Sequence, residues 1–342
     1  MFRNYRAGLK IAAGSVEGNT VSILRRRVMA AQILRRTRAA CKFSVLINRC
    51  KITTGFIHKQ ILRQSKMAVA QSGEKSVALV TGASSGIGLV CAQRLQQRGY
   101  QVYGASRHIA PSVAPHIHCL SMNVDDDESV RRSVAQIIET KARIDVVINC
   151  AGYGVAGAIE DTSIEEIRAQ FETNLFGVVR VCQHVLPTMR QQKSGLIINV
   201  SSLAGLTALP FQGIYSASKF ALEGMTESMR MEVAPFGIRV VLIEPGDFAT
   251  GFTGQRRRAA AAHALSPYHV ECEKALGRMA HDETHGSHPE IIAALIERII
   301  ATPAPRLRYS AGLMAQRFGV ALKPFLSQKF YEKMLMRMYG LR

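Results

Sequence analysis

A phenol and a primary amine lie four residues apart at Tyr215 and Lys219. At the start of a helix, this spacing places both side chains on one face. Tyrosine ordinarily has a pKa of about 10 and is a poor base near neutrality, but a neighbouring ammonium stabilises the phenolate and lowers that pKa. Ser202 precedes Tyr215 by 13 residues and could hold a carbonyl oxygen that the phenol protonates. The Tyr-x-x-x-Lys spacing also arises by chance on helix surfaces, so its meaning depends on the surrounding elements.

A glycine-rich turn at residues 81–88 lies between two segments of different periodicity. Residues 77–80 form an apolar run that predicts a buried strand, and Ile87, Cys91 and Leu95 repeat at helical spacing. Glycines allow a tight turn and close approach of the backbone, and a helix N-terminus offers unpaired N–H groups with partial positive charge. The alternative is an ordinary turn, but a strand, a glycine turn and a helix in this order predict a pyrophosphate cradle.

From Met67 onward, strand-like and helix-like segments alternate. This pattern predicts an α/β fold with a doubly wound (Rossmann) parallel sheet, in one catalytic domain over residues 67–310. Residues 250–287 interrupt the alternation and are expected to form a helical lid over the substrate site. Strands are expected near 77–81, 100–105, 117–122, 144–149, 195–201, 238–243 and 306–310, and helices near 87–98, 126–140, 163–190, 213–235 and 288–300.

The net charge of +19 is concentrated at the two ends of the 342-residue chain. Residues 1–66 contain 15 Lys or Arg and one acid, and residues 311–342 contain 6 and one, whereas residues 67–310 contain 23 of each sign. A neutral body does not offer the basic surface that nucleic acid requires, so no nucleic-acid partner is expected. The seven cysteines include no Cys-x-x-Cys pair, which favours reduced thiols over a disulfide framework.

The two charged ends allow more than one interpretation. Residues 1–66 have the composition of a disordered, dispensable extension, of a mitochondrial presequence or of a basic membrane-surface segment; the first is favoured, with a cytoplasmic protein as the consequence. Residues 311–342 form a basic amphipathic tail that could lie on a membrane or pack on its own domain or a partner subunit. Residues 194–218 carry no charge, but their polar residues and glycines fit a strand and active-site loop better than a membrane span.

Taken together, these motifs resemble those of the short-chain dehydrogenase/reductase family, over residues 75–250 closely and 251–310 loosely. The family's Thr-Gly-x-x-x-Gly-x-Gly motif corresponds to residues 81–88, and its Asn-Asn-Ala-Gly motif to residues 149–152, where Cys150 replaces the second asparagine. Its Pro-Gly-x-x-x-Thr segment corresponds to residues 245–250.

The resemblance assigns four catalytic residues. Tyr215 is the general acid in reduction and the general base in oxidation, and Lys219 lowers its pKa and binds the nicotinamide ribose. Ser202 orients and polarises the substrate carbonyl, and Asn174 anchors a water in a proton relay behind Lys219. The cofactor supplies the hydride.

The choice of cofactor depends on the end of the second strand. An acid there would accept hydrogen bonds from an NAD ribose and repel a 2′-phosphate, but residues 104–108 contain no acid. Arg107 can fork onto a phosphate, and Ser106 and Ser84 could add donors, so NADP(H) is expected rather than NAD(H). Asn123 stands where the family usually has an aspartate near the adenine. The expected cofactor-binding residues are Gly82, Ser84, Ser85, Gly86, Ile87, Gly88, Ser106, Arg107, Asn123, Val124, Asn149, Ala151, Gly152, Tyr215, Lys219, Pro245, Gly246, Phe248 and Thr250.

The predicted reaction interconverts a carbonyl and an alcohol on a small lipophilic substrate, of steroid, retinoid or fatty-acyl type. Two alternatives are a ketoacyl-thioester reductase and a non-catalytic NADP(H)-binding sensor or scaffold. A homodimer or homotetramer is expected from the resemblance.

His281, His285 and His288 have helical spacing, but Gly286 and Pro289 argue against one continuous helix, so no metal is expected. The expected substrate walls are Leu203, Leu206, Phe211, Phe248, Phe252 and Met279.

Overall fold

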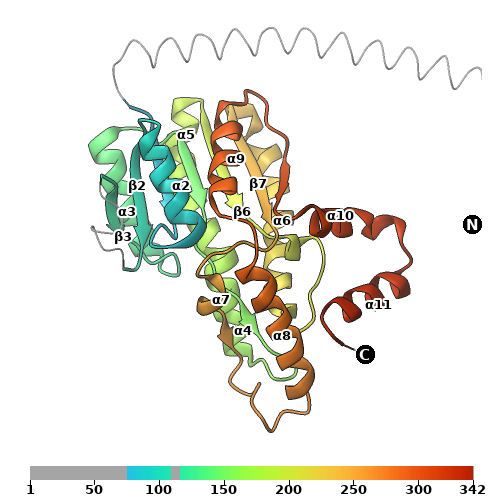
Figure 1. Ribbon diagram of the computed structural model, residues 1–342. Coiled ribbons are helices and arrows are strands. Elements are labelled where there is room, and N and C mark those ends of the chain that lie inside the picture. The colour runs from blue at the N-terminus through green and yellow to red at the C-terminus, as the bar shows by residue number, and fades with distance from the viewer. Residues whose placement is uncertain (1–74, 109–115, 342) are drawn as a thin grey trace, which may run out of the picture. The chain divides into compact units, whose positions relative to one another are not determined.

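The computed structural model describes residues 75–108 and 116–341, which fold around a parallel sheet in the order β3-β2-β1-β4-β6-β7-β9 (Figure 1). Its strands lie close to the predicted positions. The order reverses between β1 and β4, which is where doubly wound sheets open a crevice at the carboxyl ends of their strands. The strands are β1 (Val77–Thr81), β2 (Gln101–Ser106), β3 (His118–Ser121), β4 (Val146–Asn149), β6 (Gly195–Val200), β7 (Ile238–Pro245) and β9 (Arg308–Ala311).

The central strands are apolar on both faces because helices cover both sides of the sheet. Every residue of β1, β4 and β6 is buried, so these strands read as continuous apolar runs rather than as alternating ones. One face packs against α2 (Gly86–Gln97) and α9 (Glu290–Ala301). The other face packs against α3 (Asp127–Lys141), α5 (Gly177–Gln192) and α6 (Gly213–Val233) (Figure 1). The doubly wound α/β fold predicted from the sequence is thereby confirmed.

The helix expected over residues 163–190 is interrupted by a wider turn. The structure contains α4 (Ile164–Phe171), a π-helical turn η2 (Glu172–Phe176) and then α5. Ser163 and Glu166 form a capping box that fixes the start of α4. A π turn within a helix leaves no simple trace in apolar periodicity, which is why the sequence predicted one helix.

The segment that interrupts the alternation contains α7 (Phe252–Gln255), β8 (Arg257–Arg258) and α8 (His269–Thr284). Here β8 pairs in parallel with β5 (Val155–Ala156), which follows the end of β4. This two-stranded contact ties residues 250–287 to the loop beside the sheet, below the carboxyl ends of the strands in Figure 1.

The C-terminal segment forms α10 (Met314–Leu322), a 3-10 turn η5 (Lys323–Phe325) and α11 (Gln328–Met338). The last strand ends at Ala311, one residue beyond the predicted domain boundary at 310. Among the helices of residues 75–108 and 116–341, none combines the length and the apolarity needed to cross a bilayer. Residues 1–66 lie outside the described residues, so the expectations for that segment stay predictions.

Candidate active site

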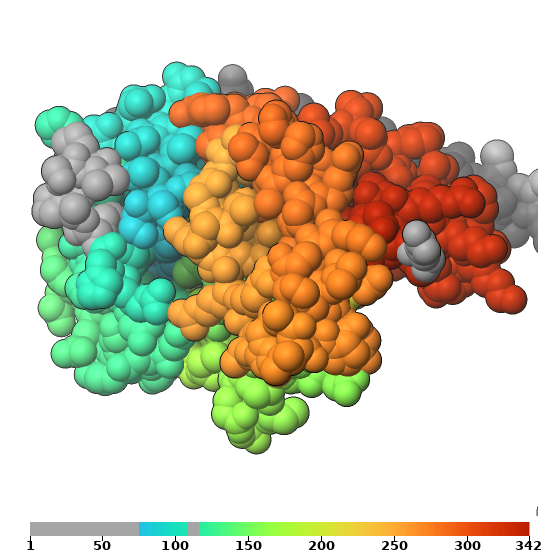
Figure 2. All heavy atoms as spheres, turned by 60° about the horizontal axis from the view of Figure 1, so that its bottom comes forward, coloured from blue at the N-terminus to red at the C-terminus, as the bar shows by residue number. Residues whose placement is uncertain are grey.

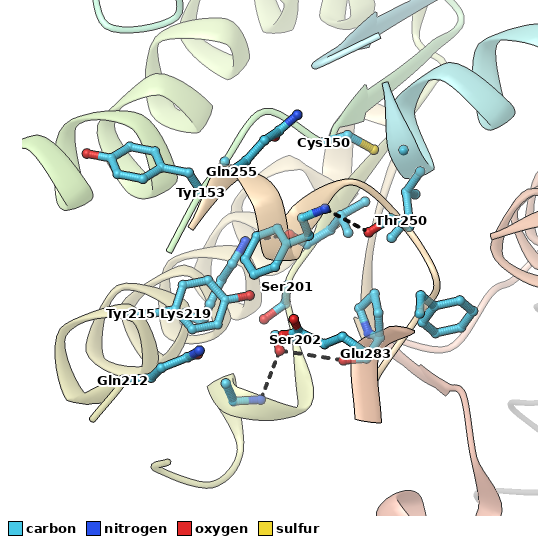
Figure 3. Close-up of a pocket in the computed structure, with 18 of the residues that line it drawn as sticks. Cys150, Tyr153, Ser201, Ser202, Gln212, Tyr215, Lys219, Thr250, Gln255 and Glu283 are labelled. Carbon is cyan, nitrogen blue, oxygen red and sulfur yellow. Dashed lines mark hydrogen bonds between the residues drawn. The ribbon is translucent and has the colours of Figure 1, made fainter. Parts of the chain in front are cut away.

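Tyr215 and Ser202 come together because β6 ends beside the start of α6. Tyr215 is the third residue of α6, and Ser202 caps the short 3-10 turn η3 (Leu203–Gly205) by accepting a hydrogen bond from the amide of Ala204 (3.0 Å). Both residues line one cavity of about 830 Å³. Their side chains lie next to each other in Figure 3. The turn therefore presents a hydroxyl next to the phenol, as the sequence predicted.

Lys219 follows Tyr215 by one turn of α6 and lies in the same cavity. Its ammonium donates a hydrogen bond to the carbonyl oxygen of Val200 (2.9 Å), at the end of β6. The ammonium also lies 5.9 Å from the centre of the Tyr215 ring. Burial lowers the pKa of Lys219 to about 8, because the charged form loses its hydration there.

The pKa of Tyr215 departs from the expectation. The sequence predicted that Lys219 would lower it, but burial raises it to about 12, and the hydrogen bond from Ser202 opposes that rise. The side chain is 7% exposed, so desolvation of the phenolate dominates. Tyr215 is therefore a protonated acid throughout the physiological pH range.

Asn174 lies in the π turn η2 and does not line the cavity. Its side chain accepts from the amide of Tyr153 (3.1 Å) and donates to the Tyr153 carbonyl oxygen (3.0 Å) and to the Ser218 hydroxyl (3.1 Å). A Cβ built on Gly152 would lie 3.0 Å from the Asn174 Oδ1 and 3.8 Å from the Lys219 Nζ. Asn174 thus connects the loop at Tyr153 to α6, and its expected catalytic role, with the water it would hold, stays a prediction.

The glycine turn forms a cradle that larger residues would fill. Gly82 has φ of +67°, in the left-handed region, and a Cβ there would lie 2.9 Å from the amide nitrogen of Ala151. A Cβ on Gly88 would collide with the carbonyl oxygen of Gly82. Ser85 precedes α2 without capping it through its side chain, so the N–H groups at this helix start face the cavity. These features fit a dinucleotide pyrophosphate.

Most of the residues predicted to bind a cofactor line this one cavity. Asn149 does not: its amide lies in the core and donates to the Asn199 Oδ1 (2.8 Å). The hydroxyl of Thr81 accepts from the amides of Cys150 (3.1 Å) and Ala151 (3.2 Å), which holds the ends of β1 and β4 together. The predicted residues that line the cavity are Gly82, Ser84, Ser85, Gly86, Ile87, Gly88, Ser106, Arg107, Asn123, Val124, Ala151, Gly152, Tyr215, Lys219, Pro245, Gly246, Phe248 and Thr250.

Comparison with known proteins decides the family. The model of the short chain dehydrogenase family matches residues 76–261. The chain belongs to this family. It is 40% identical over 269 residues to a 3-ketodihydrosphingosine reductase of Bacteroides thetaiotaomicron, which covers 79% of this chain and 100% of that protein. It is 33% identical to estradiol 17-beta-dehydrogenase 1 of Rattus norvegicus, over 69% of this chain and 73% of the relative.

A solved short-chain dehydrogenase from Streptomyces avermitilis is also similar, with a TM-score of 0.67, 30% identity, and coverage of 77% of this chain and 98% of that chain. The protein is thus a short-chain dehydrogenase/reductase, an oxidoreductase of the class that acts on CH–OH groups. Among solved structures of this fold, some hold an NADP-type cofactor and others hold NAD. The fold alone therefore leaves the choice between the two cofactors to particular residues.

In this dehydrogenase, Arg107 follows directly after β2 and is exposed at the rim of the cavity. Within the described part of the chain, no carboxylate forms an ion pair with its guanidinium. The neighbouring Ser106 hydroxyl donates its hydrogen bond to the carbonyl oxygen of His108 (2.8 Å). The hydroxyl that was expected to donate to a phosphate is therefore already used within the protein. At the end of β2, Arg107 therefore remains a side chain that can donate to a 2′-phosphate.

Several cavity residues of the dehydrogenase were missed from the sequence. Gln255 in α7 donates to the Ser85 hydroxyl (3.0 Å) and connects α7 to the glycine turn. The Arg257 guanidinium lies 4.4 Å from the centre of the Tyr153 ring. The Asp247 amide donates to the Gln316 Oε1 (3.1 Å), which joins α10 to the segment after β7. No local pattern marks these pairs, because their members lie far apart in the chain.

The substrate walls also differ from the prediction. Leu206, Phe211 and Met279 do not line the cavity; Met279 is buried in a cluster beneath α8, and Phe211 packs against that cluster. Leu203, Phe248 and Phe252 do line it, and the Phe252 ring packs 5.7 Å from the Tyr215 ring. The C-terminal helices supply the remaining apolar wall, through Val320, Tyr331, Met334, Leu335, Met338 and Tyr339.

Proposed function

We propose that this dehydrogenase reduces the ketone of a long-chain lipid with NADPH as the hydride donor. The observation that carries the proposal is the convergence of Tyr215, Ser202 and Lys219 with the glycine cradle in one cavity that also has an apolar end. Retention of a protonated phenol, a hydrogen-bonding serine and a buried amine argues against a non-catalytic sensor.

In the proposed mechanism, the Ser202 hydroxyl holds the substrate carbonyl oxygen, and the Tyr215 phenol donates its proton to that oxygen. Lys219 stabilises the phenolate that remains, and Asn174 positions the loop at Tyr153 and the helix at Ser218 around it. A dinucleotide would be held by the turn at residues 82–88 and would supply the hydride. Phe252 packs on the Tyr215 ring and excludes water from one side of the phenol.

This mechanism predicts that the rate of ketone reduction falls above about pH 8. The pKa of Lys219 is lowered to about 8, so its ammonium is present below that pH and is lost as the pH rises. Tyr215, with its pKa raised to about 12, stays protonated, so the descending limb reports Lys219. Initial rates between about pH 6 and about pH 10 at saturating cofactor measure it. Lys219→Arg should move the limb to higher pH, and a profile that is flat across this range would contradict the assignment.

The substrate class is inferred from the far end of the cavity. Its walls are apolar, and the relative at 40% identity is a 3-ketodihydrosphingosine reductase, whose named substrate is a single-chain lipid with an amino group beside its ketone. Asp247 also lines the cavity, and burial raises its pKa to about 6, so it is negatively charged at neutral pH. A carboxylate near the phenol suits a substrate with a protonated amine.

A comparison of three ketones tests this function. With NADPH, we expect kcat/KM to be highest for 3-ketodihydrosphingosine, lower for a steroid ketone and lowest for a short acetoacetyl thioester. The apolar wall stabilises a long chain by about 0.8 kcal/mol per buried methylene, so chain length should matter strongly. Preference for the thioester would favour a ketoacyl-thioester reductase instead. Binding of NADPH without turnover of any ketone would favour a sensor.

We also propose that the protein forms a homodimer or homotetramer through α4, α5 and α6. Ile164 on α4, Phe176 at the end of η2 and Met231 on α6 are exposed large apolar side chains, which supports a buried subunit contact there.

A further inference from the structure

The helix pair α10–α11 exposes an unusual share of the molecule's large apolar side chains. Of the 17 exposed large hydrophobic residues in the described part of the chain, seven lie within residues 313–338. Phe325, Met314 and Phe318 are 83%, 72% and 63% exposed. The other four are Leu313, Phe330, Met336 and Met338. Met338 also lines the cavity, so we call the surface formed by the other six exposed side chains the outer face of α10–α11.

Exposed basic residues lie among these apolar side chains along α10 and α11. Arg317, Lys329, Lys333 and Arg337 are exposed there, and the one acid of residues 311–342 is Glu332, which accepts from its neighbour Gln328. A second copy of the chain would bring the same positive charges against them in a symmetric contact. Apolar side chains with basic neighbours instead match the surface of an anionic bilayer, where rings enter the interface and cations meet headgroups.

The inner side of the same helices is a wall of the active-site cavity. From α10, Gln316 and Val320 line it, and Gln316 is hydrogen-bonded to Asp247. From α11, Leu335 and Tyr331 line it, and the Tyr331 hydroxyl donates to the Thr207 hydroxyl (3.1 Å). In Figure 2 these helices, in red, lie beside the orange segment that contains α8. A surface bound to the outer face would therefore lie one helix thickness from the cavity.

We propose that the outer face of α10–α11 docks on an anionic lipid bilayer, and that the lipid ketone enters the cavity from that surface. The docking follows from the exposed residues alone, whereas the entry of substrate rests on the proposed function. The Lys323 ammonium donates to the carbonyl oxygen of Leu206 (2.8 Å), which fastens the turn between the helices to the body while Phe325 beside it stays exposed.

Binding of the full chain to vesicles tests the docking. Vesicles of phosphatidylcholine containing phosphatidylglycerol are compared with phosphatidylcholine alone, for the wild type and for Phe318→Ser/Phe325→Ser. We expect the double variant to bind the anionic vesicles at least tenfold more weakly, because two rings no longer enter the interface. Ile159→Ser/Leu265→Ser is the matched control, since these residues are also exposed (67% and 87%) but lie elsewhere, and it should bind like the wild type.

Every protein in the comparison keeps the arginine-rich residues 1–66, so a difference between variants reports the outer face. Equal binding of the two double variants would overturn the proposal, as would a change from dimer to monomer in Phe318→Ser/Phe325→Ser without loss of vesicle binding. For entry, kcat/KM should fall for a lipid ketone presented in vesicles and stay unchanged for a water-soluble short ketone. If no lipid ketone is reduced in any form, the proposed function fails while the vesicle measurement still decides the docking.

Discussion

Replacing Tyr215 by phenylalanine is expected to lower the rate of ketone reduction by roughly 10² to 10⁴-fold, the usual contribution of a positioned general acid. The change removes one oxygen from a cavity that is otherwise preserved. The phenylalanine ring would keep its contact with Phe252, and Ser202 would keep its hydrogen bonds to Ala204 and Pro245. Affinity for NADPH should therefore change little, and the loss should appear in kcat.

The matched control for this variant is Tyr153→Phe. Tyr153 lines the same cavity, but its ring lies under Arg257, and its backbone, not its hydroxyl, makes the contacts with Asn174. This variant should retain the wild-type rate within about threefold. Rates are measured by NADPH oxidation, and cofactor affinity by fluorescence titration. Comparable losses in both tyrosine variants, or full activity of Tyr215→Phe, would remove Tyr215 from the proposed role.

Replacing Arg107 by aspartate is expected to change cofactor preference. Hydrogen bonds from a guanidinium to a phosphate contribute about 1.5–3 kcal/mol, so their loss lowers kcat/KM for NADPH by roughly tenfold to a hundredfold, and repulsion from the new carboxylate adds to it. The carboxylate can instead accept from the ribose hydroxyls of NADH, so kcat/KM for NADH should rise or stay constant. Because Arg107 is exposed, its replacement should leave the core intact, and the change in preference should report the cofactor contact.

The control is Arg132→Asp, which makes the same change of charge at an exposed position on α3 (side chain 69% exposed). It should leave the ratio of NADPH to NADH activity unchanged. An unaltered ratio in Arg107→Asp as well would show that the 2′-phosphate is bound elsewhere, and NADP(H) preference would lose its structural basis.

The local features of the fold were predictable because they depend on near neighbours in the chain. Apolar runs such as residues 77–80 and 195–200 indicated buried strands, and burial on both faces explains why they do not alternate. The left-handed φ of Gly82 explains why the glycine turn carries its own signature. The π turn around Asn174 was not predictable, because a shift of one residue in helical pairing hardly alters the apolar pattern.

The candidate site likewise has features that could be predicted from the sequence and features that could not. The sequence by itself determined the chemical identity of the site, since Tyr215, Lys219, Ser202 and the glycine turn have spacings that one strand and one helix impose. Only the tertiary structure decided their electrostatics. Burial sets the pKa of Tyr215 near 12 and that of Lys219 near 8, and burial depends on segments distant in the chain.

The shape of the cavity also came only from the tertiary structure. Gln255 meets Ser85 across 170 positions, and Gln316 meets Asp247 across 69, and no periodicity connects such residues. The C-terminal helices, which the sequence showed only as a basic amphipathic tail, form a wall of the substrate cavity on one side and expose apolar and basic residues on the other. Amphipathic spacing specifies that a helix has two faces, but the surface that each face meets is set by packing of the whole chain.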